Sequence, residues 1–286
     1  MKISSLILAL CLLANAATAA ELSIVSFNLE SDADTDYLSV SRDISRIPRS
    51  DIWALSEVPP RHFDDYRSAI GKNFEIIAGT TGRSDRLAIA FDPDTLQNID
   101  SYSELAEAGG SRHPLMAKFR VKASGQEFVF VANHLQRGKE KIRQAQAAWL
   151  NEWAAMQLRT GAASIIMDGD FNFDVDPKSR KGNEAYRLFV RDDVFRWIEP
   201  ECLASMTCPS TGTGCNPKYN SILDFVFLAG EAKSWAARSS ILFRNDAEYC
   251  AKEDLRDAYQ TSGQGDNGAT ILGGSDHRPV RAVLSL

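Results

Sequence analysis

Acidic, amide and imidazole side chains recur at the points where apolar runs of this chain begin or end. Six apolar runs carry one or two of them at an end, inside the run or directly before it. The residues are Asn28, Glu57, Asn133, His134, Asp170, Asn172, Asp224, Asp276 and His277. Charged side chains in or beside buried strands are costly unless they are paired or bound to a cation. Six strands that share this cost indicate one common pocket.

The atom types in this set indicate what the pocket does. Carboxylate and amide oxygens without a thiolate favour a hard divalent cation, Mg²⁺ before Mn²⁺ or Ca²⁺. His134 and His277 add groups that transfer protons or hydrogen-bond an anion. Such a site is suited to phosphate-ester hydrolysis, in which a metal-polarised water attacks phosphorus in line. The set therefore predicts a metal-dependent phosphoric ester hydrolase.

Strands and helices alternate along the chain, and hairpins occur among them. The apolar patterns predict strands at residues 22–30, 51–58, 74–79, 86–92, 114–123, 127–135, 163–167, 222–229 and 279–286. Helical spacing predicts helices at 38–47, 61–70, 139–158 and 184–192. No linker or repeat interrupts this order, so residues 21–286 are expected to form one catalytic domain. Mixed connections favour an α/β sandwich over a purely parallel, doubly wound sheet.

The first twenty residues have the pattern of an export signal. Lys2 precedes an apolar run at 3–13, and the small-residue tract ANAATAA predicts cleavage near Ala19 or Ala20. The apolar run is too short for a stable membrane anchor, so a secreted or periplasmic protein is expected. The alternative, a buried N-terminal helix, fits the alanine-rich tract less well.

Four cysteines remain once this segment is removed, and an even number in an exported chain favours two disulfides. Cys202, Cys208, Cys215 and Cys250 allow three pairings, which the sequence leaves open. Their spacing does not match paired zinc hooks, and no histidine lies among them, so a zinc site is the weaker alternative. The bridges would fix the loops on either side of Asp224.

The formal net charge of −6 excludes an overall basic field and weighs against a pure nucleic-acid-binding module. Two local basic clusters nevertheless follow strand ends that are expected at the rim of the pocket. They consist of Arg137, Lys139, Lys141 and Arg143, and of Lys178, Arg180 and Lys181. Such clusters can follow a nucleic-acid backbone, although each alone is as consistent with a solvated helix start.

Six short motifs occur in an order that resembles a known series. SFNLE, LSEV, ANHL, GDFN, LDFVF and GGSDHRPV follow the motifs of the endonuclease/exonuclease/phosphatase superfamily across nearly the whole chain after the signal. Its members include pancreatic-type deoxyribonucleases, abasic-site endonucleases, bacterial sphingomyelinases and inositol polyphosphate phosphatases. The resemblance implies a four-layered α/β sandwich, in which two packed mixed β-sheets are flanked by helices.

The resemblance also implies roles for single residues. Asn28, Glu57 and Asp276 would help to hold the metal, and Glu57 has a loop or capping carboxylate as its alternative reading. Asp170 would orient or deprotonate the attacking water, and Asn172 would hold the phosphate or the water beside it. The catalytic set expected from these matches is His134, Asp170, Asn172, Asp224 and His277.

The two histidines would contact the scissile phosphate, and Asp224 would keep His277 in the required tautomer. Asp85 would orient His134 in a similar way, or lie in an exposed turn. Arg112 stands in an Arg-x-Pro pattern that implies a substrate-phosphate contact, with a solvated arginine as the alternative. Asp168 and Asp174 are expected in a loop or behind the site.

Substrate choice depends on loops, where the sequence is less informative. SILDFVF and GDFN lack the features of the inositol phosphatases, and the late segment 244–274 is polar and glycine-rich, unlike a lipid-docking hairpin. The segment is expected to be a mobile loop beside the site. The basic clusters favour a nuclease with nucleic acid as substrate, acting as a monomer without an obligate protein partner. The alternatives are a phosphodiesterase or phosphatase of a lipid or small-molecule head group, and a catalytically silent binding protein.

Overall fold

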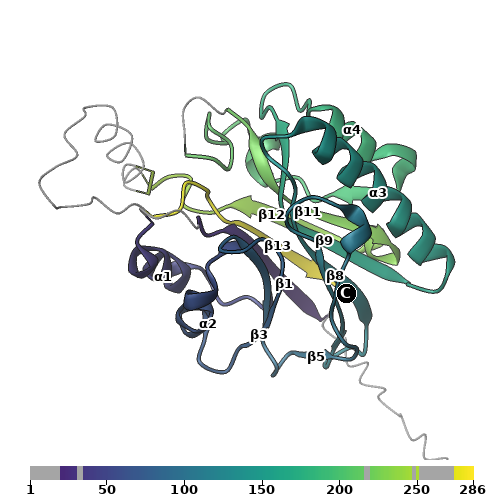
Figure 1. Cartoon of the computed structure of the whole chain (residues 1–286), viewed down its shortest axis with the longest axis horizontal. Coiled ribbons are helices and arrows are strands. Elements are labelled where there is room, and N and C mark those ends of the chain that lie inside the picture. Colours follow the sequence, from purple (N-terminus) through teal and green to yellow (C-terminus); the bar gives the residue numbers. More distant parts are fainter. Residues whose placement is uncertain (1–19, 31–34, 216–219, 247–248, 251–273) are drawn as a thin grey trace, which may run out of the picture.

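Alternating apolar residues along the strands build two mixed sheets that pack face to face, with helices on both outer sides (Figure 1). The computed structural model describes residues 20–30, 35–215, 220–246, 249–250 and 274–286. The first sheet has the strand order β12-β13-β1-β2-β4-β3. Its strands are β1 (Glu21–Asn28), β2 (Ile52–Val58), β3 (Glu75–Ala78), β4 (Arg86–Phe91), β12 (Ala236–Ile241) and β13 (Val280–Ser285).

The second sheet has the order β10-β11-β9-β8-β7-β5, and β6 pairs with β7 beside this path. Its strands are β5 (Leu96–Asn98), β6 (Ser103–Glu104), β7 (Leu115–Val121), β8 (Glu127–His134), β9 (Ser164–Val175), β10 (Phe195–Trp197) and β11 (Ile222–Gly230). The pairs β1–β2 and β8–β9 are parallel, and the other ladders within the two sheets are antiparallel. Both sheets are therefore mixed, as the sequence predicted.

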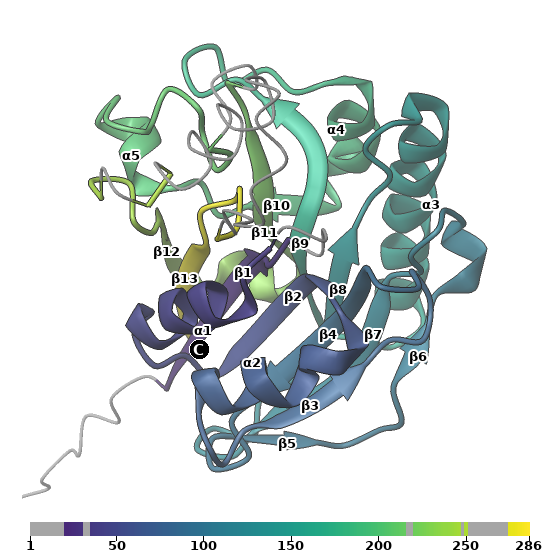
Figure 2. The same cartoon turned by 60° about the vertical axis from the view of Figure 1, so that its left-hand side comes forward.

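Helices cover the outer face of each sheet and complete four layers. Those on the first sheet are α1 (Tyr37–Arg46) and α2 (Phe63–Ile70), and those on the second are α3 (Glu140–Arg159) and α4 (Glu184–Phe189). Figure 2 shows α1 and α2 on one side of the paired sheets and α3 and α4 on the other. A short α5 (Glu201–Ala204) precedes β11. The predicted four-layered α/β sandwich is confirmed.

The apolar core consists of three layers that match the strand periodicity. Along β9, Ile166 packs between the two sheets, whereas Ile165 and Met167 pack under the helices of the second sheet. Asp168 and Asp170 follow Ile166 at steps of two and so point toward the space between the sheets. The aspartates of β9 thus continue the inward-facing positions of the strand beyond Ile166, its last apolar residue between the sheets.

Several elements differ from the sequence prediction. The strand predicted at 163–167 continues to Val175, because its polar second half keeps the pairing with β8 and β11. Short elements were missed: β10 and α5 span three and four residues, and β12 (Ala236–Ile241) lacks a strong apolar alternation. Residues 1–19 of the predicted signal segment and most of the late polar segment lie outside the described residues. Within those residues, no helix is long and apolar enough to cross a membrane.

Candidate active site

The predicted site residues come from both sheets and meet at one end of the space between them. The first sheet provides Asn28 at the end of β1 and Glu57 near the end of β2. The second sheet provides His134 from β8, Asp170 and Asn172 from β9, and Asp224 from β11. Asp276 and His277 lie just before β13. Glu57 and Asp276 thus belong to one connected cluster, as the contacts below establish.

Asn28 joins the two sheets at the centre of the cluster. Its Nδ2 donates to Glu57 Oε1 at 3.0 Å and to Asp170 Oδ2 at 3.2 Å, while its Oδ1 accepts from the backbone N of Glu30 at 3.0 Å. These hydrogen bonds fix the amide at both its nitrogen and its oxygen, and the side chain is 1% exposed.

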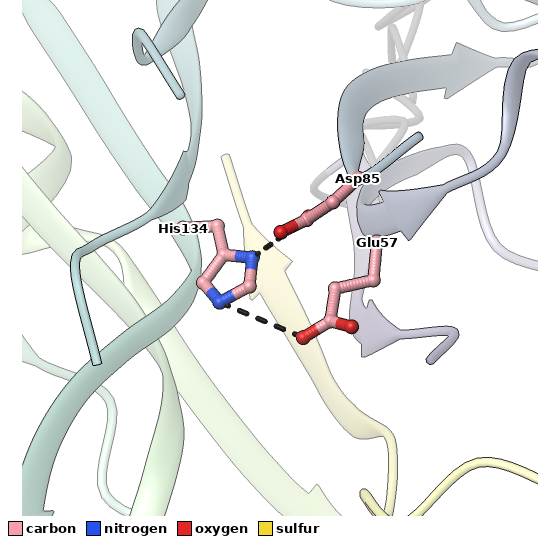
Figure 3. Close-up of side chains that lie close together, drawn as sticks. All are labelled: Glu57, Asp85 and His134. Atoms are coloured by element: carbon pink, nitrogen blue, oxygen red, sulfur yellow. Dashed lines mark ion pairs between the residues drawn. The ribbon is translucent and has the colours of Figure 1, made fainter. Parts of the chain in front are cut away.

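His134 lies between carboxylates that approach both of its ring nitrogens (Figure 3). Its Nδ1 is 3.4 Å from Asp85 Oδ1, and its Nε2 is 3.7 Å from Glu57 Oε1. The same Nε2 is 3.4 Å from Asp170 Oδ2. Asp85 and Glu57 approach from the side of the first sheet, and His134 belongs to the second. The expected pairing of Asp85 with His134 is therefore present.

His277 forms a second imidazole–carboxylate arrangement on the other side of Asp170. Its Nδ1 is 2.8 Å from Asp224 Oδ2, and its Nε2 is 3.9 Å from Asp170 Oδ2 and 3.7 Å from Asp276 Oδ1. Burial alone lowers the pKa of His277, but the negative charges, first that of Asp224, outweigh it and hold the pKa well above its usual range. The charged imidazolium is thus the favoured form.

Asp170 is the carboxylate shared by both arrangements. It is 2% exposed, and its Oδ1 accepts from the backbone N of Asn172 at 2.9 Å. Burial raises the pKa of Asp170, and the neighbouring His134 and His277 counteract that rise. A buried carboxyl group with a raised pKa is the type of group that acts as a general base near neutral pH.

The backbone is irregular at three positions in the site. Glu57 has a φ of 55°, and the pairing of β2 with β4 shifts between Leu55 and Val58. Leu55 and Val58 both face the helices, although residues three apart in a regular strand face opposite sides. The alternation is therefore interrupted between them, at Glu57. Asn172 has a φ of 52°, and the β9–β11 register shifts just before Asp224. Strained backbone and bulges of this kind concentrate at functional sites.

A glycine allows the acidic part of β9 to approach β8. Gly169 has a φ of 134°, and a Cβ at this position would lie 2.1 Å from the carbonyl oxygen of Asn133. Any side chain at Gly169 would therefore push apart the two strands that carry His134 and Asp170. The glycine of the GDFN motif is explained by this contact.

Two arginines contact residues of the site, Arg112 at His134 and Arg137 at Asn172, and each is held by an acid. Arg112 pairs with Asp85, and its side chain is only 11% exposed, so the solvated-arginine alternative is wrong. Arg137 donates to Asn172 Oδ1 at 3.2 Å and to Asp174 Oδ1 at 2.5 Å, with 38% of its side chain exposed. The sequence did not predict this direct contact of Arg137 with the site.

Asp168 and Asp174 were expected in a loop or behind the site, and the loop alternative is wrong because both belong to β9. Asp174 holds Arg137 at the rim. Asp168 is fully buried, and its pKa is raised well above the usual range, mainly by burial, while a contact with Ser26 lowers it. Continued alternation from Ile166 would have revealed the inward direction of Asp168 and Asp174.

The donor set of the site fits a hard divalent cation. Glu57, Asp85 and His134 each offer one ligand atom, and these three atoms lie within 4.8 Å of one another. This group shares only Glu57 with the predicted ligand set of Asn28, Glu57 and Asp276.

Carboxyl groups also outnumber the basic groups of the cluster, even if both histidines are protonated. The carboxyl groups are those of Glu57, Asp85, Asp170, Asp224 and Asp276, and the basic groups are His134, His277 and Arg112. An added cation would offset this excess.

The four cysteines form two disulfides, which the sequence predicted without their pairing. The bonds join Cys202 to Cys208 and Cys215 to Cys250. The second bond lies next to the site, because the backbone N of Cys215 donates to the carbonyl oxygen of Asp276 at 2.7 Å. The zinc alternative for these cysteines is therefore wrong.

Solved structures share this architecture. An endonuclease/exonuclease/phosphatase from Bacteroides vulgatus superposes with a TM-score of 0.66 at 17% identity, covering 93% of this chain and 99% of that chain. A mannosyl-6-phosphatase of Bacteroides thetaiotaomicron gives 0.65 at 19% identity, covering 93% and 100%. A truncated TDP2 of Caenorhabditis elegans gives 0.63 at 13% identity, covering 93% and 98%. No protein-family model and no curated protein sequence matches the chain. The chain therefore has the endonuclease/exonuclease/phosphatase fold, as its motif series predicted.

Proposed function

We propose that this protein is a metal-dependent phosphoric ester hydrolase, and specifically a phosphodiesterase of the endonuclease type. One observation carries the proposal: Asp170 Oδ2 lies 3.4 Å from His134 Nε2 and 3.9 Å from His277 Nε2, and it accepts from Asn28, which also holds Glu57. A potential general base thus lies between two imidazoles, next to the best metal ligand. A binding protein would not require both imidazoles, each with its own orienting carboxylate.

In the proposed reaction, Asp170 orients the attacking water and accepts its proton. His277 presents its protonated Nε2 to a phosphoryl oxygen, and Asp224 holds the Nδ1 proton at 2.8 Å. His134 presents Nε2 from the opposite side, oriented through Nδ1 by Asp85. These groups bind and orient the phosphate on two sides, which places the water in line with the leaving group.

The fold and the donor set support a bound Mg²⁺, with Mn²⁺ or Ca²⁺ as substitutes. Glu57 is the ligand we propose first, together with Asn28 and Asp276 from the sequence prediction. Asp85 and His134 provide the other donors within reach of Glu57. When bound, the cation would polarise the phosphoryl oxygen and stabilise the negative charge that develops on the leaving group.

Nucleic acid is the substrate that the cations at the rim support best. Arg112 contacts the backbone carbonyl oxygen of His134, Arg137 contacts Asn172, and acids hold both arginines in place. Such cations would contact the phosphates that flank the scissile one in a polymer. Asn172 lies on β9, the strand that carries Asp170, and its Oδ1 accepts from Arg137. Its Nδ2 donates to the carbonyl oxygen of Leu135 at 3.0 Å.

A phosphatase of a small phosphorylated molecule is the second candidate. The likeness to a mannosyl-6-phosphatase, at 19% identity, favours it. A monoester substrate carries its dianionic phosphate at the scissile position itself, so it would depend little on Arg137. We further propose that the protein acts outside the cytoplasm, which its two disulfides support.

A substrate panel tests the proposal. Supercoiled plasmid, single-stranded RNA, sphingomyelin vesicles, bis(p-nitrophenyl) phosphate and mannose 6-phosphate are each incubated with Mg²⁺ or with a chelator. We expect Mg²⁺-dependent plasmid nicking and diester hydrolysis, and loss of both in His277→Ala and Asp170→Ala. Thr160→Val, at the distant end of α3, is the control for handling and folding. Hydrolysis of the monoester alone would favour the second candidate, and no hydrolysis of any substrate would refute both.

A further inference from the structure

A short segment preceding β11 contacts both partners of the Asp224–His277 pair. We call residues 211–215 the strap. Gly214 forms an isolated antiparallel bridge with His277. On either side of this bridge, Cys215 N donates to Asp276 O at 2.7 Å, and Arg278 N donates to Thr213 O at 2.6 Å. The strap therefore pairs with the backbone of three consecutive residues, 276–278, that include the proposed metal ligand and the phosphate-binding imidazole.

Thr213 connects the strap to the other partner. Its side chain is fully buried, and its Oγ1 accepts from the backbone N of Leu223 at 2.9 Å and of Asp224 at 3.3 Å. These two amides lie where the β9–β11 register shifts. A bulge leaves backbone donors without their ladder partners, so the hydroxyl satisfies them and fixes the direction of Asp224.

The Asp224–His277 contact needs such a connection because its partners belong to different sheets. Asp224 lies on β11 of the second sheet, and His277 directly precedes β13 of the first. No ladder joins β11 to β13. The 2.8 Å contact between the side chains therefore depends on packing and on the strap, which is bonded to the backbone on both sides.

The strap is anchored covalently at one end. Cys215 is bonded to Cys250, and the neighbouring Tyr249 donates its hydroxyl to the carbonyl oxygen of His277 at 2.6 Å. Arg278 also donates from one guanidinium nitrogen to Gly214 O at 2.6 Å and to Thr211 Oγ1 at 3.0 Å. The other disulfide, Cys202–Cys208, spans α5 and the turn after it, and within the described part of the chain neither of its cysteines is hydrogen-bonded to residues 276–278.

We propose that Thr213 is a positioning residue for the Asp224–His277 pair, and that the Cys215–Cys250 disulfide keeps the strap in its working position. The inference rests on the proposed hydrolase function for its kinetic test. Reduction by a dithiol breaks the sulfur–sulfur bond: two electrons and two protons pass from the dithiol to Cys215 and Cys250, and the dithiol becomes a cyclic disulfide. The strap then loses its anchor, and the pair loses its alignment.

Substitutions at Thr213 test the positioning role. Thr213→Val keeps the shape but removes the acceptor, and we expect kcat on bis(p-nitrophenyl) phosphate to fall by about 10- to 100-fold, the usual range for groups that orient a catalytic residue. KM should change by less than about threefold, because the hydroxyl does not touch substrate. Thr213→Ser retains the acceptor and should restore most of the activity. Thr160→Val serves as the matched control.

The disulfide is tested by removing each bond separately. In Cys202→Ala/Cys208→Ala, the dithiol should lower kcat to the level of Cys215→Ala/Cys250→Ala without reductant. In Cys215→Ala/Cys250→Ala, the dithiol should have no further effect. Equal sensitivity of both double variants, or of neither, would overturn the role of the disulfide.

A spectroscopic readout separates this inference from the proposed function. The Nδ1 proton of His277, hydrogen-bonded to Asp224, should give a downfield ¹H resonance in the wild type and in Thr213→Ser. It should weaken or shift in Thr213→Val and after dithiol treatment. An unchanged resonance in Thr213→Val would refute the positioning role even if the enzyme is active. The expected resonance changes in a protein that hydrolyses none of the substrates would uphold the strap and refute the hydrolase proposal.

Discussion

Asp224→Asn is the substitution that tests the proposed mechanism most directly. The change keeps the size of the side chain but removes the charge that faces His277 Nδ1 at 2.8 Å. Asp224 is 0% exposed and His277 is 6% exposed, so solvent screens their attraction little. The asparagine amide also allows His277 to adopt the wrong tautomer. The imidazolium would lose the interaction that outweighs its burial.

The size of the effect follows from burial. Removing one partner of a buried, hydrogen-bonded ion pair costs about 3–5 kcal/mol. If the reaction uses the imidazolium, and each ~1.4 kcal/mol of barrier changes the rate tenfold, kcat should fall by about 10²- to 10⁴-fold. A neutral hydrogen bond in the same place would be worth only about 0.5–1.5 kcal/mol, so a loss below tenfold would indicate that charge is not involved.

The pH dependence of activity tests the assignment of His277 independently. Because the pKa of His277 is raised in the folded protein, the wild type should retain the imidazolium above neutral pH and lose activity only as pH rises through that folded-state pKa. On the acidic side, activity should fall as Asp170 is protonated, and its raised pKa places this fall at a higher pH than for an ordinary aspartate. We call the two falls in activity the acidic and the alkaline limb. In Asp224→Asn the alkaline limb should move to lower pH, while the acidic limb moves much less.

Stability should follow the same linkage. A group with a raised folded-state pKa stabilises the fold fully below its unfolded pKa, about 6.5 for histidine, and this contribution is lost as pH rises through the folded pKa. The stability difference between wild type and Asp224→Asn should therefore be larger at pH 6 than at pH 10. Hydrolysis of bis(p-nitrophenyl) phosphate across pH and urea unfolding at both pH values measure the two effects. A variant with wild-type kcat and an unmoved alkaline limb would refute the assignment of His277 and Asp224.

Three further predictions concern other parts of the site. Glu57→Gln should raise the Mg²⁺ concentration for half-maximal activity by about 10-fold or more, and an unaltered titration would contradict its ligand role. Asp168→Asn should stabilise the fold by about 1–3 kcal/mol at pH 8 and by less at pH 4, because the raised pKa of this acid costs stability as pH rises above its unfolded value; urea unfolding that shows destabilisation at pH 8 would oppose this. Arg137→Gln should reduce the slope of log affinity for DNA against log salt by about 1, while Arg187→Gln, on α4, should leave it unchanged; equal slopes would remove Arg137 from the substrate path.

The sequence predicted the parts of the site that depend on strand periodicity and motif order. His134, Asp170 and Asp224 lie at inward-facing positions of β8, β9 and β11, in line with Phe130, Ile166 and Val226 between the sheets. A period of two places such residues without knowledge of tertiary structure. The same alternation, continued beyond Met167, places Asp168 and Asp174 on β9 instead of in a loop.

Other features depend on contacts that a single sequence does not contain. Glu57 would face the helices if β2 were regular, and only the positive φ and the shifted pairing turn it to the site. Arg137 follows His134 by three residues, but its contact with Asn172 depends on where β8 ends relative to β9. The disulfide pairing is likewise set by chain geometry, since three pairings are open to four cysteines.

The contacts that define the site cross from one sheet to the other. Asn28 reaches Asp170, Glu57 approaches His134, and His277 pairs with Asp224, each time across the same interface. Below them, the apolar core between the sheets begins around Ile166 and Ile24. A small displacement of one sheet would alter all three contacts together, while the ladders inside each sheet would remain intact. Activity should therefore respond to changes in the packing between the sheets before global stability does. The strap, bonded to β11 and to the residues directly before β13, opposes this displacement next to His277.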